Sequence, residues 1–330
     1  FPGLPRKVSN QSDLFALLRE NDLFLHHPYQ SFTPVLDLLD QAATDPEVLA
    51  VKLTIYRTGL DSPISQALIR AAEAGKEVTA VIELRARFDE AANIELASRL
   101  QEAGANVVYG VVGFKAHCKM LLVVRREGKH LRRYVHLGTG NYNAKTARLY
   151  SDFGLLTSDP EITEDVHNIF QQLTGLGKAS KLKQLVQTPF SLRSRLIELI
   201  DREGEHARQG KKAVITAKMN SLVDRAVIEA LYRASQAGVR IDLIVRGICC
   251  LRPGVAEVSD NITVRSIVGR FLEHHRIVYF HNDGDPYVLA GSADWMPRNL
   301  QRRVEVCFPL RRKKIRHRAV LEGLGIFLQD

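Results

Sequence analysis

The chain has 330 residues, of which 45% are hydrophobic and 25% are charged, enough apolar material for two domains of roughly 150 residues each. No stretch reaches the roughly 18 uninterrupted apolar residues of a membrane span, and the four cysteines lack the spacing of a zinc site or disulfide framework. The net charge of +9 indicates a polyanionic partner and leaves nucleic acid, acidic membrane and polyphosphate open.

The first half begins with a helical region and continues with apolar strands. The pattern over residues 12–46 predicts two helices and a linker that contains His26 and His27. An apolar strand at 48–56, an amphipathic helix that ends at Gly75 and a strand at 78–84 then form a β-α-β unit. Such units favour a mainly parallel sheet with covering helices. Further strands are expected at 106–112, 120–126 and 132–138.

The second half follows the same plan. A polar, helical segment over 177–213, with a break at Pro189, leads into it. Apolar runs predict further strands, at 212–220, 240–245, 262–268, 276–282 and 287–293. A basic run at 310–318 reads by itself as the solvated face of a helix.

An internal repeat relates the two halves. Six residues of the first β-α-β unit recur at the same spacing in the second: Ala67, Leu68, Arg70, Ala71, Ala74 and Gly75 match Ala230, Leu231, Arg233, Ala234, Ala237 and Gly238. We therefore expect an α/β fold of two tandem homologous domains, 1–180 and 181–330. Each would be a mixed, mainly parallel sheet flanked by helices.

A histidine and a cation two residues apart open an apolar strand in each half, as His117-x-Lys119 and His274-x-Arg276. A glycine loop follows each pair, "GTGNYN" from Gly138 and "GSADWMPRN" from Gly291. One such pair reads as the polar start of a buried strand, whereas two copies in register indicate a site. A neutral imidazole can attack phosphorus while a second histidine moves the leaving-group proton. The pattern therefore predicts phosphoryl transfer, with both halves closing on one phosphate.

Other polar residues extend this constellation. Backbone N–H groups, hydroxyls and amides at the glycine loops supply donors for phosphate oxygens. Arginines at strand ends suit a polyanion channel. Two carboxylates, Asp152 and Glu305, are candidates to orient the motif histidines through hydrogen bonds. The amide and guanidinium candidates are Asn141, Asn143, Asn299, Arg57, Arg85, Arg87, Arg246, Arg302 and Arg303.

These residues match a known family. The chain resembles the C-terminal half of the bacterial polyphosphate kinases that phosphorylate a histidine, a family similar to the phospholipase D superfamily. The resemblance covers nearly all of the chain and is specific, because its motifs occur in order. They include "LHHPYQSF", "IYRTGLDSPI", "KAHCKM", "HLGTGNYNAKTARLYSDFGLLT", "VRGICCLRPG", "FLEHHRIVYFHNDG" and "SADWMPRNLQRRVEV". It implies that both domains are phospholipase D-like.

The resemblance also implies roles for the site residues. His117 would be the phosphorylated nucleophile, His274 the second catalytic histidine, and Lys119 a catalytic group that holds the transferred phosphate. The nucleotide and phosphate contacts would come from Tyr150, Arg246, His274, Arg303, Asn141 and Asn143. Arg57 and Arg87 match arginines that the family associates with magnesium. Because a guanidinium cannot ligate a cation, we expect them to grip Mg²⁺-bridged phosphate oxygens.

The implied partners are ATP or ADP, inorganic polyphosphate and Mg²⁺, without nucleic acid. A cytoplasmic enzyme with peripheral association at the inner face of the membrane is expected, as a homo-oligomer in its full-length form. The chain opens on Phe1 and lacks the family's N-terminal and head domains, so we expect a piece of a longer protein. Two alternatives remain. A phospholipase D-type phosphodiesterase or phosphatidyltransferase is disfavoured by Arg276, where that class needs lysine, and a non-catalytic polyanion-binding module also fits the basic charge.

Overall fold

The computed structural model describes residues 3, 8, 13–56, 62–83, 90–110, 114–175 and 181–329. The chain divides into two compact units, Phe1–Leu185 and Val186–Asp330. The predicted boundary, after residue 180, falls close to this division. Among the described residues, no helix is both long enough and apolar enough to cross a membrane.

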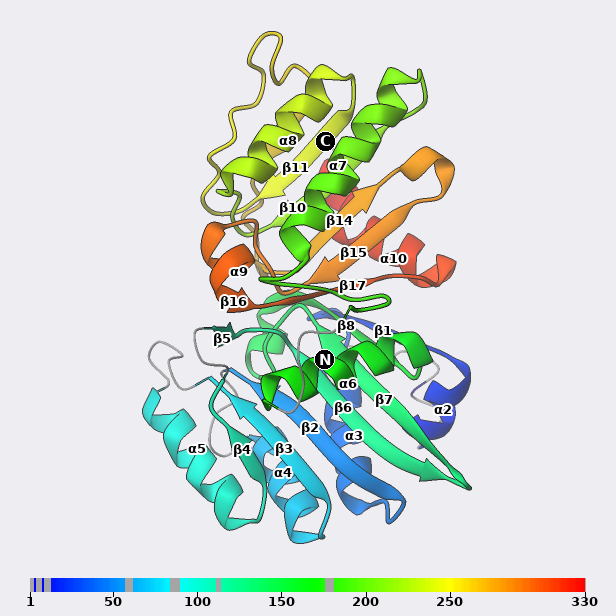
Figure 1. Cartoon of the computed structure of the whole chain (residues 1–330), viewed down its shortest axis with the longest axis vertical. Coiled ribbons are helices and arrows are strands. Elements are labelled where there is room, and N and C mark those ends of the chain that lie inside the picture. The colour runs from blue at the N-terminus through cyan, green and yellow to red at the C-terminus, as the bar shows by residue number, and fades with distance from the viewer. Residues whose placement is uncertain are drawn as a thin grey trace. The chain divides into compact units, whose positions relative to one another are not determined.

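The first unit is built around one twisted sheet (Figure 1), whose strands run in the order β1-β8-β7-β6-β2-β3-β4. Its elements are α2 (Leu14–Glu20), β1 (Leu23–His27), α3 (Thr33–Thr44), β2 (Val48–Ile55), α4 (Pro63–Glu73), β3 (Glu77–Ile82), α5 (Glu90–Glu102), β4 (Asn106–Val108), β5 (Lys115–Ala116), β6 (Met120–Glu127), β7 (His130–Gly138), η1 (Thr146–Arg148), β8 (Tyr150–Thr157) and α6 (Pro160–Leu173).

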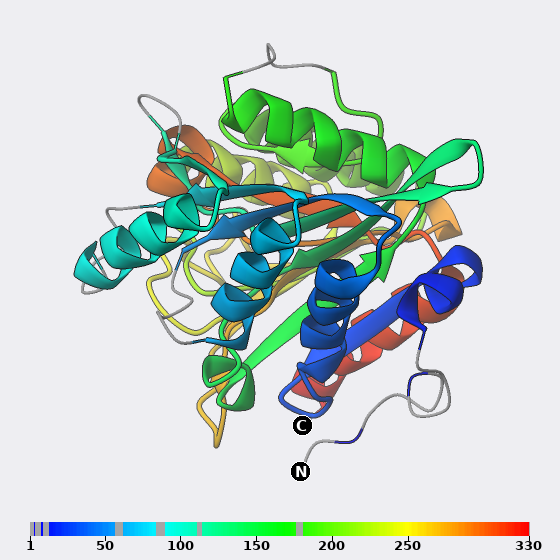
Figure 2. The ribbon, with the colours of Figure 1, turned by 90° about the horizontal axis from the view of Figure 1, so that it is seen from below.

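Helices cover both faces of this sheet, because its central strands are apolar on both sides. In β6, Leu121 and Val123 belong to the hydrophobic core that also includes α3, α4 and α5. The alternate residue Leu122 is equally buried but points to the opposite face, as the period of two in a strand requires. That face is covered by α6, which packs on β6 and β7. Figure 2 shows α6 on one side of the sheet and α3 to α5 on the other.

The second unit repeats this topology. Its strands run in the order β12-β11-β10-β14-β15-β17-β9, which matches the first unit strand for strand when that order is read backwards. Its elements are β9 (Val186–Gln187), α7 (Leu192–Arg208), β10 (Val214–Met219), α8 (Arg225–Gln236), β11 (Arg240–Val245), β12 (Ile262–Arg265), β13 (Leu272–Glu273), β14 (Arg276–Phe280), η2 (Asn282–Gly284), β15 (Tyr287–Gly291), α9 (Pro297–Arg302), β16 (Arg303–Val304), β17 (Val306–Pro309), α10 (Lys313–Gly323) and η3 (Gly325–Leu328).

The repeated residues of the sequence hold equivalent structural positions. Ala67, Leu68 and Ala71 lie on the buried face of α4, and their counterparts Ala230, Leu231 and Ala234 lie on the buried face of α8; each set packs into the core of its unit. Each helix is followed by a glycine in the left-handed region, Gly75 with φ +80° and Gly238 with φ +97°. A side chain there would be strained, which accounts for glycine in both copies. The predicted duplication is therefore confirmed.

Two details differ from the prediction. The sheets are mixed, as expected, but they are not mainly parallel: only β2-β3-β4 and β10-β11-β12 pair in parallel, and the other described neighbours within each unit are antiparallel. The later strands of each unit are joined without crossover helices, which permits antiparallel pairing. The predicted linker at His26 and His27 is also wrong, because residues 23–27 form β1 and pair antiparallel with β8.

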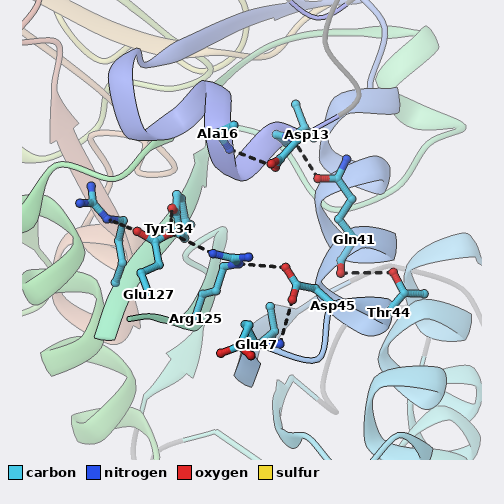
Figure 3. A network of polar contacts seen from close by, with 12 residues as sticks. Asp13, Ala16, Gln41, Thr44, Asp45, Glu47, Arg125, Glu127 and Tyr134 are labelled. Atoms are coloured by element: carbon cyan, nitrogen blue, oxygen red, sulfur yellow. Dashed lines mark hydrogen bonds and ion pairs between the residues drawn. The ribbon is translucent and has the colours of Figure 1, made fainter. Parts of the chain in front are cut away.

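A polar network holds the far end of the β6–β7 hairpin, at the opposite end of β6 from His117 (Figure 3). Arg125 links the carboxylate of Asp45, at 2.8 Å, to that of Glu127, at 3.3 Å. The Tyr134 hydroxyl also donates to Glu127, and burial together with this carboxylate raises the pKa of Tyr134. These contacts fix the hairpin to the segment after α3, so the network is structural rather than catalytic.

Candidate active site

The first histidine motif lies directly before β6 and against the end of β2. The His117 ring is half-buried and meets the ring of Tyr56 edge to face, with centroids 4.7 Å apart. The ammonium of Lys119 is buried, lies 4.8 Å from the centroid of the same ring, and donates to the main-chain carbonyl of His117. Both side chains therefore contact Tyr56, while the intervening Cys118 is buried and its carbonyl accepts from Thr54 Oγ1 at 2.8 Å.

The second motif has the same internal geometry at the start of β14. The guanidinium of Arg276 donates to the carbonyl of His274 at 2.8 Å and lies 3.2 Å from its ring nitrogen Nε2. Its other side is bound by Asp294, at 3.0 Å, and both members of this ion pair are buried. Burial raises the pKa of Asp294, but the charge and hydrogen bonds of Arg276, with those from Asn220, lower it to about 2. The cation of the motif is therefore held in place.

The glycine loops lie beside the motifs in matching register. The N–H of Gly138 donates to the carbonyl of Lys119 at 3.0 Å, and Gly291 is the partner of Arg276 in the β14–β15 pair. The next residue in each loop donates its hydroxyl to a buried carboxylate. Thr139 donates to Asp152, and Ser292 donates to Glu305, each at 2.6 Å. The two carboxylates singled out from the sequence thus hold equivalent places, and their proposed action on the histidines stays a prediction.

The loop amides serve different purposes. Asn143 Oδ1 accepts from the backbone N–H groups of the turn that follows, at 3.0 and 3.2 Å. Asn299 Nδ2 donates to Glu305 at 2.8 Å. Asn141 lines a small cavity with His27 and His136, in which Asn141 Oδ1 and the Nε2 atoms of both rings are buried without a hydrogen-bond partner. Of these amides, Asn141 and Asn299 each retain a buried Oδ1 acceptor without a hydrogen-bond partner.

The remaining candidates lie at strand ends. Tyr150 is the first residue of β8 and is half-buried, and Arg303 is the half-buried first residue of β16. Arg246 follows the parallel strand β11 and donates to Asn220 Oδ1 at 2.7 Å. Guanidinium groups at such positions suit phosphate oxygens. The two arginines connected with magnesium, Arg57 and Arg87, lie outside the described residues, as does Arg85.

Sequence reasoning missed two groups that organise the motifs. Tyr56 and Asp294 were not singled out, although both lie within quoted motifs. The hydroxyls of the glycine loops were expected as phosphate donors, whereas those of Thr139 and Ser292 donate to the buried carboxylates of Asp152 and Glu305. Within the described part of the chain, no three His, Cys, Asp or Glu side chains are arranged to hold a metal ion. The site's own groups are imidazoles, an ammonium and guanidiniums, which suit phosphate rather than a bare cation.

Two tandem units with this strand order belong to the class of proteins with a phospholipase D-like fold, and here each unit has a His-x-cation pair at the beginning of the central strand, β6 or β14. The solved phosphatidylserine synthase from Haemophilus influenzae shares this fold, with a TM-score of 0.61 at 12% identity over 94% of this chain and 86% of that one. Within this class, the chain belongs to the polyphosphate kinase family. Its residues 13–179 match the family's "Polyphosphate kinase C-terminal domain 1" and residues 185–330 match "Polyphosphate kinase C-terminal domain 2".

Individual relatives agree with this assignment. The polyphosphate kinase of Burkholderia multivorans is 61% identical over 99% of this chain and 48% of its own length. The crystal structure of polyphosphate kinase from Porphyromonas gingivalis superposes with a TM-score of 0.93 at 39% identity, over 100% of this chain and 50% of that one. The chain thus spans about half the length of these relatives.

Proposed function

We propose that this chain is the catalytic half of a polyphosphate kinase, which transfers the terminal phosphate of ATP reversibly to a growing inorganic polyphosphate chain through a phosphohistidine. One observation carries the proposal. In each unit an imidazole is followed by a cation that holds the histidine's own carbonyl, and both copies lie in the same register against a glycine loop. Such pre-set cations and donors favour a reaction in which charge shifts among phosphate oxygens.

In the first step, a ring nitrogen of His117 attacks the γ-phosphorus of ATP. The N–P bond forms as the bond between the γ-phosphorus and the β–γ bridging oxygen breaks, and ADP leaves with that electron pair. Lys119 stabilises the transferring oxygens, because its buried ammonium is fixed two residues from the attacking ring. His274 supplies or accepts the proton that the leaving oxygen exchanges.

In the second step, a terminal oxygen of polyphosphate attacks the phosphorus held on His117. The new P–O bond forms as the N–P bond breaks, so that the imidazole is regenerated and the chain is one phosphate longer. Each step replaces one bond to phosphorus with a similar one, so the same two steps can run in reverse and form ATP from ADP and polyphosphate. The buried ion pair between Arg276 and Asp294 keeps the second motif in one geometry throughout.

The nucleotide and the polyphosphate chain would be bound by the remaining polar groups. We assign these contacts to Tyr150, Arg246, Arg303, Asn141 and Asn143, with Asp152 and Glu305 orienting the histidines. Mg²⁺ would arrive on the phosphates of the nucleotide, where it neutralises charge, and Arg57 and Arg87 would grip the bridged oxygens. The full-length protein would be a cytoplasmic homo-oligomer that associates peripherally with the inner face of the membrane.

The test is acid-labile ³²P on the full-length protein after incubation with [γ-³²P]ATP and Mg²⁺. We expect label on the wild type and on His274→Ala, and none on His117→Ala. His130→Ala, which changes an exposed histidine of β7, is the matched control and should keep the label. A wild-type protein without label would overturn the kinase proposal. Release of a headgroup from phosphatidyl substrates by that unlabelled protein would instead support a phospholipase D-type activity.

A further inference from the structure

A lysine of the second unit grips the residues on both sides of His274. The ammonium of Lys218, in strand β10 next to β14, forms an ion pair with Glu273 and lies 3.0 Å from Nε2 of His275. All three residues are buried, with exposures of 3%, 8% and 0% for Lys218, Glu273 and His275. The side chains of Glu273 and His275, on either side of His274 in the chain, thus both contact the ammonium of Lys218.

The chemistry of the contact fixes its direction. An ammonium can only donate, so in its contact with Lys218 the Nε2 atom of His275 accepts. The same Nε2 atom also lies 3.3 Å from the carbonyl oxygen of Gly323. Phe327 of η3 covers the ammonium, whose nitrogen lies 3.9 Å from the ring centroid. A desolvated cation over an aromatic face is more strongly bound than an exposed one. The arrangement is therefore closed around Lys218 rather than open to solvent.

The first unit has a residue with the same task at the matching position. Lys119 and Arg276 occupy equivalent positions, because each lies beside the first glycine of its loop. The residues that follow them, Met120 and Ile277, are therefore equivalent too. In the neighbouring strand, Thr54 lies opposite Met120 and Lys218 lies opposite Ile277, so Thr54 and Lys218 are also equivalent. Thr54 Oγ1 donates to the carbonyl of Cys118 and accepts from the N–H of Met120 at 3.0 Å. In both units, the strand beside the motif, β2 or β10, thus binds the residue between the histidine and the cation.

We infer that Lys218 is a positioning residue for His274, which sets the ring's place by binding Glu273 and His275. This inference rests on the proposed function, since it assumes that His274 takes part in the reaction. Arg276 holds the carbonyl of His274, whereas Lys218 holds the side chains of the preceding and following residues. Loss of Lys218 frees the main chain at His274, and a misplacement of about 1 Å lowers turnover by about 100-fold.

The experiment measures the rate of phosphohistidine formation on the full-length protein for Lys218→Met, His274→Ala and the double variant. We expect Lys218→Met to lower kcat by about 100-fold with little change in the KM for ATP, and to have no further effect once His274 is alanine. An equal loss in both backgrounds would overturn the inference while leaving the proposed function intact. Full activity of His274→Ala would remove the role of His274 and with it this inference, whereas the kinase proposal depends on the label on His117 and would stand.

A second measurement tests the role of Lys218 even if Lys218→Met is unstable or His274→Ala forms no label. Lys218→Met combined with Glu273→Gln leaves no buried unpaired charge, and hydrogen exchange of its 271–277 peptide is compared with the wild type. We expect faster exchange in this peptide alone, together with the same loss of kcat. Full activity in this folded variant would overturn the inference. Lys211→Met, which breaks an exposed ion pair with Asp283, is the control and should change neither readout.

Discussion

His136 should make the protein lose stability in mild acid. The ring is buried between β7 and β8 beside Tyr142, whose hydroxyl oxygen lies 2.8 Å from Nδ1. Burial, and secondarily the neighbouring His27, lower the pKa of His136 from 6.5 to about 3. Between these values the unfolded chain binds a proton that the folded protein does not, so stability falls as the pH decreases.

The size of the effect follows from the two pKa values. A difference of one in pKa corresponds to about 1.36 kcal/mol. Above pH 6.5 His136 is neutral in both states and does not lower the free energy of unfolding, whereas at pH 5 its titration lowers that free energy by about 2 kcal/mol. Near pH 3 the loss reaches about 5 kcal/mol and then stops, because the folded protein also becomes protonated. The pKa of His27 is lowered as well, chiefly by burial, which adds to the loss in the same direction.

Urea unfolding at pH 7 and pH 5, followed by far-UV circular dichroism, measures this loss. His136→Asn keeps a polar group beside Tyr142 but removes the titration, so its unfolding free energy should fall by about 2 kcal/mol less than that of the wild type between the two pH values. His130→Asn, at the exposed start of β7, should behave as the wild type. The same pH dependence in His136→Asn and wild type, or a His136 ring that titrates near pH 6.5 by NMR, would refute the reasoning.

Three further predictions concern the second unit. Asp294→Asn breaks a buried ion pair and should lower the free energy of unfolding by about 3 kcal/mol at pH 7, with a smaller deficit as the pH falls towards 2 in chemical denaturation. Gly291→Ala places a methyl group 2.5 Å from Cys307 Sγ and should lower the melting temperature, whereas Gly269→Ala meets open space and should not. Burial raises the pKa of the Cys307 thiol to about 12, so iodoacetamide at pH 8 should alkylate the exposed Cys250 and leave Cys307 unmodified until the protein unfolds, as mass spectrometry would show.

The sequence determined the duplication and the place of both histidine motifs. Ala67 and Leu68 recur as Ala230 and Leu231 because each pair faces a core. A helix that faces a core needs apolar residues at helical spacing, and this spacing is visible in the sequence. These features were predictable because each depends on residues a few positions apart.

The tertiary structure decided what surrounds the motifs. Asp294 reaches Arg276 across 18 residues, and Lys218 reaches His275 across 57, because antiparallel strands bring distant residues into register. The same pairing made His27 the end of a strand opposite Asp152 rather than part of a linker. Local patterns show which segments become strands and helices, whereas the order and register of the strands follow from how whole faces pack. The sequence therefore located the motif histidines, and only the fold revealed the groups that hold them.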